Sequence, residues 1–258
     1  MEGFWSLLDR LSRTRLLLVF LVIAAITIGL LAALLGKNTP WGVLVLDFSS
    51  NSPFRFPFTI QNLMLILFFL GIGDLLGRAA AARREMSYLK EELLPEDDET
   101  VIGVNDLGGV RRRIHGRHDS ERGFLLYLLN VCILQIQANR SIEQAVSVLN
   151  SSLDLLNHRV DLRYQLIRYL VWVIPTIGFI GTVVGIAQAL GYVNPEHMDI
   201  KLITGSLGIA FNTTIVALAL SALLVFCQSG VQKYEETALN LAGDYCLKNL
   251  INRLYIDD

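Results

Sequence analysis

Three threonine hydroxyls in uncharged stretches of the sequence are the best candidates for chemistry. Thr182 lies in the uncharged run from residue 171 to 191, and Thr213 and Thr214 lie in the uncharged run from residue 202 to 228. A hydroxyl donates one hydrogen bond and accepts others, so it can offer an oxygen to a passing ion. A single threonine in a membrane helix often only bonds the carbonyl four residues back. At similar depth, however, these three hydroxyls could line one shared cleft.

No ionisable side chain accompanies these hydroxyls within the apolar runs. The first, third and fourth runs contain no Asp, Glu, Lys, Arg or His, and Asp74 stands at the end of the second. Proton relays and ion-coupled transporters normally hold such a group inside the membrane. The chain therefore cannot bind and release a proton at mid-membrane by itself, and we expect a second protein to supply the carboxylate.

Four apolar runs are long enough to position these hydroxyls as membrane helices. They are residues 16–36, 58–77, 172–190 and 202–228, in a chain of 258 residues that is 53% hydrophobic and 18% charged. About 20 apolar residues cross a bilayer as a helix. The first run is longer than the apolar part of a signal peptide, which favours a permanent span. These features predict an all-α, polytopic membrane protein with four transmembrane helices and cytoplasmic helical extensions.

The basic residues predict how the chain is oriented. Clusters of arginine precede span one, follow span two and precede span three, which the positive-inside rule places in the cytoplasm. Both termini are then cytoplasmic, and the loop at residues 37–57 lies outside. The clusters are Arg10, Arg13 and Arg15; Arg78, Arg83 and Arg84; and Arg159, Arg163 and Arg168.

Small residues in spans three and four predict close helix packing. Gly178, Gly181 and Gly185 fall on one face of a helix, together with Thr182 and Gln188, so another backbone can approach there. Small-residue faces usually indicate helix packing, and Gly205 and Gly208 are expected to serve the same purpose in span four. Pro175 removes a backbone donor one turn into span three, which favours a kink.

The sequence divides into four segments. Residues 1–77 hold the first two spans, 78–165 a cytoplasmic helical domain, 166–228 spans three and four, and 229–258 a cytoplasmic C-terminal helix. Within the second segment, residues 124–136 predict a buried helix too short to span. Ser141 and Gln144 fit a capping box that opens another helix, whose apolar stripe predicts an unbroken run into span three. The run Arg111 to Arg113 is typical of a solvated face, or of contact with anionic lipid or an acidic partner.

Enzyme, metal and nucleic-acid functions find little support. The formal net charge is −2, whereas a nucleic-acid-binding domain is usually basic. No Ser/His/Asp or Cys/His constellation is readable, so we expect no enzyme and no cofactor. The cysteines and histidines lack metal-ligand spacing and are expected to be buried thiols and scattered polar residues. They are Cys132, Cys227, Cys246, His115, His118, His158 and His197.

Two motifs resemble the MotA/TolQ/ExbB family of ion-driven motor and energy-coupling subunits. Residues 175–186 read PTIGFIGTVVGI and resemble the family signature, and residues 210–218 read AFNTTIVAL and are similar to its second pore helix. The resemblance covers residues 164–234.

That resemblance implies a ring, a pentamer in the family pattern, in the bacterial inner membrane. The ring would enclose two single-span partners of the MotB/TolR/ExbD type, each with a membrane aspartate and an extracytoplasmic domain. Ion flow past the ring's threonines would drive rotation or force. By position, Thr182 and Thr214 would face the partner's aspartate, Thr213 would be an auxiliary hydroxyl, and Pro175 would be the hinge.

The residues leave the branch and the ion open. In the TolQ and ExbB branch a glutamate stands five residues before the second threonine, where this chain has Ile209. The paired threonines suit H⁺ or Na⁺ transfer. A structural membrane scaffold, in which the glycine faces only pack helices, is the competing interpretation.

Overall fold

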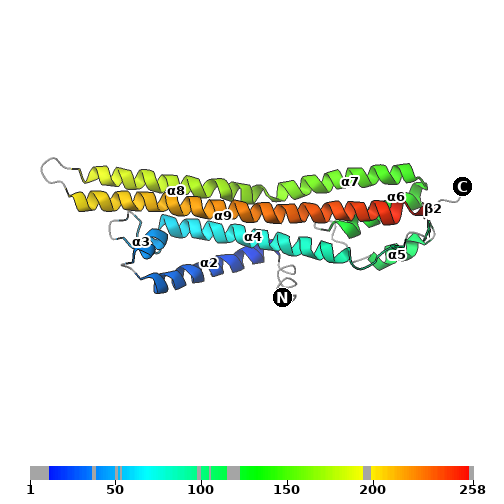
Figure 1. Cartoon of the computed structure of the whole chain (residues 1–258), viewed down its shortest axis with the longest axis horizontal. Helices are drawn as coiled ribbons and strands as arrows, with labels where there is room; N and C mark the ends of the chain where they lie inside the picture. Colours follow the sequence, from blue (N-terminus) through cyan, green and yellow to red (C-terminus); the bar gives the residue numbers. More distant parts are fainter. Residues whose placement is uncertain are drawn as a thin grey trace. The chain divides into compact units, whose positions relative to one another are not determined.

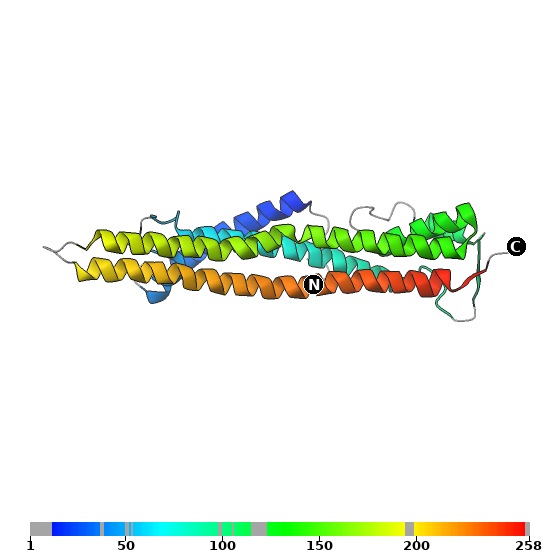
Figure 2. The ribbon, with the colours of Figure 1, turned by 90° about the horizontal axis from the view of Figure 1, so that it is seen from above.

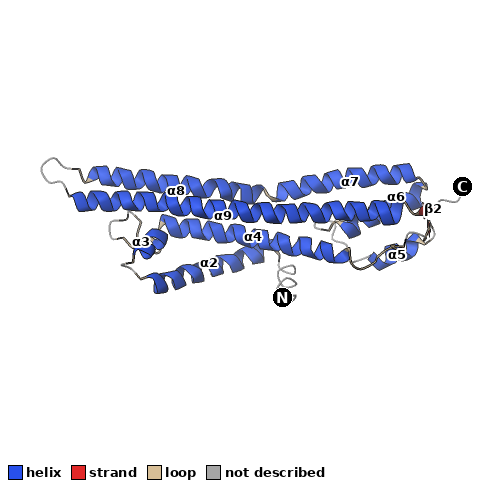
Figure 3. Cartoon of the chain, viewed as in Figure 1, coloured by secondary structure: helices blue, strands red, loops and turns tan. Residues whose placement is uncertain are grey.

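A computed structural model gives the fold of this chain (Figure 1). The structure describes residues 12–36, 39–49, 52, 54–97, 100–104, 106–114, 123–193 and 199–255. The described part consists almost wholly of helices (Figure 3). It forms two compact units, one from Met1–Gly77 with Gln165–Gly230 and one from Arg78–Tyr164 with Val231–Asp258.

The first unit contains four apolar helices, which confirms the predicted multi-pass, all-α membrane protein. These are α2 (Arg13–Leu35), the first part of α4 (Ile60–Tyr88), α8 (Gln165–Gly191) and the first part of α9 (Ile200–Cys246). Four helices in the described residues are long and apolar enough to cross a membrane. The short helix α3 (Pro40–Leu46) stands between α2 and α4, and the side chain of Thr39 caps its N-terminus.

Two glycines allow α2 and α4 to pack as an antiparallel pair. A Cβ built on Gly73 would lie 2.6 Å from the ring of Phe20, and one on Gly77 would lie 3.2 Å from Leu16. At the end of the pair that holds the start of α2, Arg13 Nε donates to Asp74 Oδ1 over 2.8 Å. Asp74, predicted at the end of span two, is thus buried in an ion pair with the start of α2.

The second unit is built around α6 (Leu125–Asn139) and α7 (Ile142–Arg163). Nearly half of the α6 side chains are buried, as expected for a short apolar helix that does not span. The hydroxyl of Ser141 caps α7 by accepting from the Gln144 N–H. The Gln144 side chain instead accepts from Asn139 and Gln135, so only the serine half of the predicted capping box forms.

The C-terminal part of α9 and two short strands complete the second unit. A π-helical turn, η1 (Leu247–Ile251), follows α9, and β2 (Leu254–Tyr255) then pairs in parallel with β1 (Ile102–Gly103). The basic helix α5 (Leu107–Ile114) buries its apolar residues and exposes Arg112 and Arg113. The function of that basic run stays a prediction.

The helix predicted to run unbroken into span three is interrupted at Tyr164. There α7 ends and α8 begins, and the Tyr164 N–H donates to Asp161 and Leu162 rather than four residues back. The apolar stripe continues through Leu156, Val160 and Ile167, all buried, so the sequence pattern gave no sign of the break.

Candidate functional site

Helices α8 and α9 lie side by side in both views of the ribbon (Figures 1 and 2). Three glycines of α8 make their approach close. A Cβ built on Gly178 would lie 2.3 Å from the Cβ of Ala217, and one on Gly185 would lie 2.7 Å from the Cβ of Ala210. A Cβ on Gly181 would lie 2.7 Å from the Thr213 hydroxyl. Contacts this short leave no room for a side chain on α8, so each of these positions requires glycine. We call this contact line the α8–α9 seam.

Three threonine hydroxyls converge on two backbone carbonyls at the seam. Thr213 Oγ1 donates to the Ala210 carbonyl over 2.7 Å and reaches the Gly178 carbonyl at 3.3 Å. Thr182 Oγ1 reaches the Ala210 carbonyl at 3.1 Å and the Gly178 carbonyl at 3.3 Å. Thr214 Oγ1 lies 3.5 Å from the Gly178 carbonyl and makes a short hydrogen bond with Thr182 Oγ1. We call these five oxygens the threonine cluster.

The bonds across the seam distinguish these threonines from ordinary helix threonines. Thr27, Thr176 and Thr204 each donate to the carbonyl four residues back in their own helix. In contrast, Thr182 and Thr214 bond each other across two helices, and both reach the Gly178 carbonyl. The structure thus brings together residues that lie 32 positions apart in the sequence.

The members of the threonine cluster differ in exposure. Thr213 is 1% exposed and lies between the helices, whereas Thr182 and Thr214 are only partly buried. The large side chains next to them, including Phe179, Val183 and Phe211, are exposed in the single chain. The open side of the cluster is therefore set in an apolar surface.

The other small residues that the sequence singled out have different surroundings. Gly208 is exposed, and a Cβ built on it would meet no atom within 4 Å in this chain. Gly205 is half-buried on the same helix. Helix packing at these two positions stays a prediction. Pro175 lies inside α8, which continues through it as a helix, and its use as a hinge also stays a prediction.

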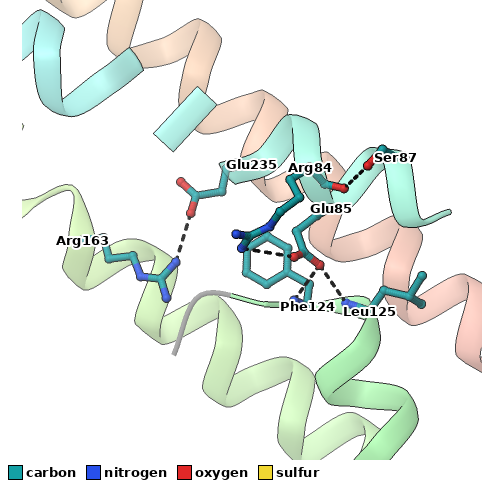
Figure 4. Close-up of polar contacts among 7 residues, drawn as sticks. All are labelled: Arg84, Glu85, Ser87, Phe124, Leu125, Arg163 and Glu235. Carbon is teal, nitrogen blue, oxygen red and sulfur yellow. Dashed lines mark hydrogen bonds and ion pairs between the residues drawn. The ribbon is translucent and has the colours of Figure 1, made fainter. Parts of the chain in front are cut away.

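A group of charged and polar side chains in the second unit was missed by sequence reasoning. Glu235 Oε2 accepts from the Tyr164 hydroxyl over 2.9 Å. Figure 4 shows the contact of Glu235 with Arg163, in which Glu235 Oε1 lies 3.4 Å from Arg163 Nη1. The Arg78 guanidinium stacks over the Tyr164 ring at 4.6 Å and donates to the Arg163 carbonyl. This group surrounds the break between α7 and α8. No periodic pattern signals it, because its members come from three distant parts of the chain.

Burial shifts the pKa of two members of this group. Burial raises the pKa of Glu235, against the hydrogen bond from Tyr164 and the charges of Arg78 and Arg163, which lower it. Burial and the neighbouring Glu235 also raise the pKa of Tyr164. The tyrosine therefore stays protonated and donates to the carboxylate.

A second buried carboxylate in this unit caps a helix. Glu85 Oε2 accepts from the backbone N–H groups of Phe124, over 2.8 Å, and Leu125, over 3.1 Å (Figure 4). These N–H groups stand at the start of α6, where a helix has no internal acceptors and favours negative charge. Glu85 thus serves the fold of the second unit.

The structure offers no metal site within the part of the chain that it describes. No three His, Cys, Asp or Glu side chains gather there as metal ligands would. Among the histidines, His115, His118 and His197 lie outside the described residues.

Comparison with known families confirms the resemblance drawn from the two motifs. The model of the MotA/TolQ/ExbB proton channel family matches residues 119–241, a segment that contains α8 and the whole threonine cluster. Over these residues the chain matches a family whose members are channels and energy transducers rather than enzymes and work in complexes with partner proteins. No curated protein and no solved structure matches the chain.

The family match bears on the general function of the molecule. It implies a channel of the proton-driven motor type, formed by a multi-pass membrane protein.

Proposed function

We propose that this chain is the ring subunit of an ion-driven motor in the bacterial inner membrane. Five copies surround two single-span partner helices, each with an aspartate within the membrane. H⁺ or Na⁺ passes between that aspartate and the threonine cluster, and the transfer turns the ring around the partner. Both termini of the ring subunit lie in the cytoplasm.

The threonine cluster supports this proposal more than any other feature. Thr182 and Thr214 hold each other across the α8–α9 seam and stay partly exposed, in spans that contain no acidic or basic side chain. Hydroxyls and carbonyls can relay a hydrogen bond or coordinate a cation, but they do not release a proton at neutral pH. An acid from another chain completes such a site, and the apolar surface around the cluster suits an incoming membrane helix.

Partner-dependent ion flux tests the proposal. The chain is co-expressed with a candidate partner, chosen from the neighbouring genes as a single-span protein that carries an aspartate near the start of its span. Native mass spectrometry of the purified complex should give five copies of the chain to two of the partner. In liposomes, the complex should carry ions, and replacing the partner's aspartate with asparagine should stop the flux. Flux through the chain alone, or a stable monomer, would contradict the proposal.

Flux measured in the same liposomes distinguishes a motor from a membrane scaffold and identifies the transported ion. A scaffold would form the complex but pass no ions under any gradient. A proton channel keeps its flux when choline replaces Na⁺, whereas a Na⁺ channel loses it. Several oxygens within hydrogen-bonding reach could hold either ion, so this measurement decides between them.

A further inference from the structure

Pro175 leaves one carbonyl of α8 without its usual donor. In a helix, the N–H of each residue donates to the carbonyl four residues back, and proline has no N–H. The carbonyl affected by Pro175 is that of Val171, at the cytoplasmic end of the uncharged run. Within a bilayer an unsatisfied backbone group is costly, because water cannot replace the donor.

Ser221 of α9 supplies the missing donor. Its Oγ donates to the Val171 carbonyl over 3.0 Å, and Ser221 is 8% exposed. A serine in a helix commonly bonds the carbonyl four residues back in its own helix. The Ser221 bond instead crosses to α8, at the position where the proline has left an acceptor.

This bond lies on the α8–α9 seam, as does the threonine cluster. Ala217, one turn before Ser221, meets Gly178, and Thr213, two turns before it, reaches the Gly178 carbonyl at 3.3 Å. The carbonyls of Val171 and Gly178 are two turns apart on α8, about 10 Å at 1.5 Å per residue. Pro175 lies between them. The helix is therefore bonded to α9 on both sides of its proline.

We propose that Ser221 is a positioning residue for the ion pathway. By replacing the donor that Pro175 lacks, it fixes α8 against α9 on the cytoplasmic side of the proline. The bond to α9 on this side of the proline then helps to hold the Gly178 carbonyl and Thr182 in place opposite Thr214. This role rests on the proposed function, since it matters for ion transfer only if ions pass the threonine cluster.

Backbone hydrogen exchange tests the bond without requiring ion flux. Mass spectrometry follows exchange in α8 around residues 172–179, in the purified complex in detergent micelles. In Ser221→Ala, exchange there should accelerate about tenfold, the effect of losing one buried hydrogen bond. Ser221→Thr keeps the hydroxyl and should behave as the wild type.

A proline substitution provides the matched control. In Pro175→Ala, the new N–H at position 175 donates to the Val171 carbonyl, so adding Ser221→Ala should change exchange little. An equal acceleration in both backgrounds would show that Ser221 only fills space. Unchanged exchange in Ser221→Ala alone would also overturn the proposal.

Ion flux then tests whether Ser221 positions the ion pathway or only stabilises the contact between α8 and α9. In liposomes with the partner, Ser221→Ala should reduce flux about tenfold and Ser221→Thr should restore it, with the complex intact by native mass spectrometry. Full flux in Ser221→Ala would overturn the positioning role. If the wild-type complex carries no ions, the proposed function fails, while the exchange experiment still decides whether Ser221 replaces the missing donor.

Discussion

At the scale of single residues, the threonine cluster contains more acceptors than hydrogens. Thr182 has one hydroxyl hydrogen but three oxygens within reach, those of Gly178, Ala210 and Thr214. Only one of these bonds can be donated at a time, so the hydroxyls can exchange partners without any helix moving. An arrangement of this kind suits transfer of an ion better than rigid storage of one.

The sequence predicted that these three hydroxyls could lie together, but not what they bond. The uncharged runs and the two family motifs singled out Thr182, Thr213 and Thr214. The carbonyl acceptors at Gly178 and Ala210, like the bond from Ser221 to Val171, depend on how closely two helices approach. That distance is set by packing and is not encoded in the residue types alone.

Glu235 should make stability depend on pH. Because its pKa is raised above the ordinary 4.5, its contribution is fully present below that value and is lost as pH rises through the pKa in the folded protein. The variant Glu235→Gln lacks this titration. The thermal midpoint of the wild type, measured relative to that of Glu235→Gln, should therefore fall as pH rises above about 4.5. A difference that stays constant, or rises with pH, would show that Arg163 and Arg78 outweigh burial.

At the scale of helices, the α8–α9 seam depends on residues that lack side chains. Gly178, Gly181 and Gly185 each face an atom of α9 less than 3 Å from where a Cβ would stand. The helical spacing of these glycines predicted a close approach, and the hydropathy of the runs predicted the helices themselves. The break at Tyr164 could not be predicted, because Arg78 and Glu235, which bond around it, are remote in sequence.

A methyl group at Gly181 should force α8 and α9 apart. In Gly181→Ala the new Cβ would meet Thr213 Oγ1 at 2.7 Å and Thr213 Cβ at 2.9 Å, so the helices must shift. Overpacking of this kind costs about 1–3 kcal/mol. The thermal midpoint of the purified protein should therefore fall. The matched control is Gly29→Ala in α2, where a Cβ meets nothing within 4 Å and no fall is expected. Equal behaviour of the two variants would contradict the close seam.

At the scale of the whole molecule, orientation in the membrane decides on which side each loop and terminus lies. The arginine clusters predict cytoplasmic termini, and the four apolar helices of the described chain are compatible with that arrangement. Length and composition identify spans, but neither can show which side of the membrane a loop occupies. Orientation therefore stays a prediction.

Thiol labelling from one side of the membrane tests this orientation. Val193, between spans three and four, is 47% exposed, and Tyr255, near the C-terminus, is 60% exposed. In a Cys227→Ser background, a membrane-impermeant maleimide should label Val193→Cys in intact spheroplasts and Tyr255→Cys only after lysis. Native Cys132 and Cys246 should contribute little signal, because both are buried and burial raises the pKa of Cys132 to about 12. The reverse labelling pattern would invert the orientation.

The central claim is that ions pass the Thr182 and Thr214 hydroxyls on their way to or from the partner's acid. The most direct measurement is ion flux in liposomes that contain the complete complex, with both threonines replaced by valine, which keeps their shape. The account predicts that flux falls about tenfold or more while the complex stays assembled, and that Thr27→Val, which removes a hydroxyl bonded only within α2, has no effect. Undiminished flux in the double valine variant would contradict the account.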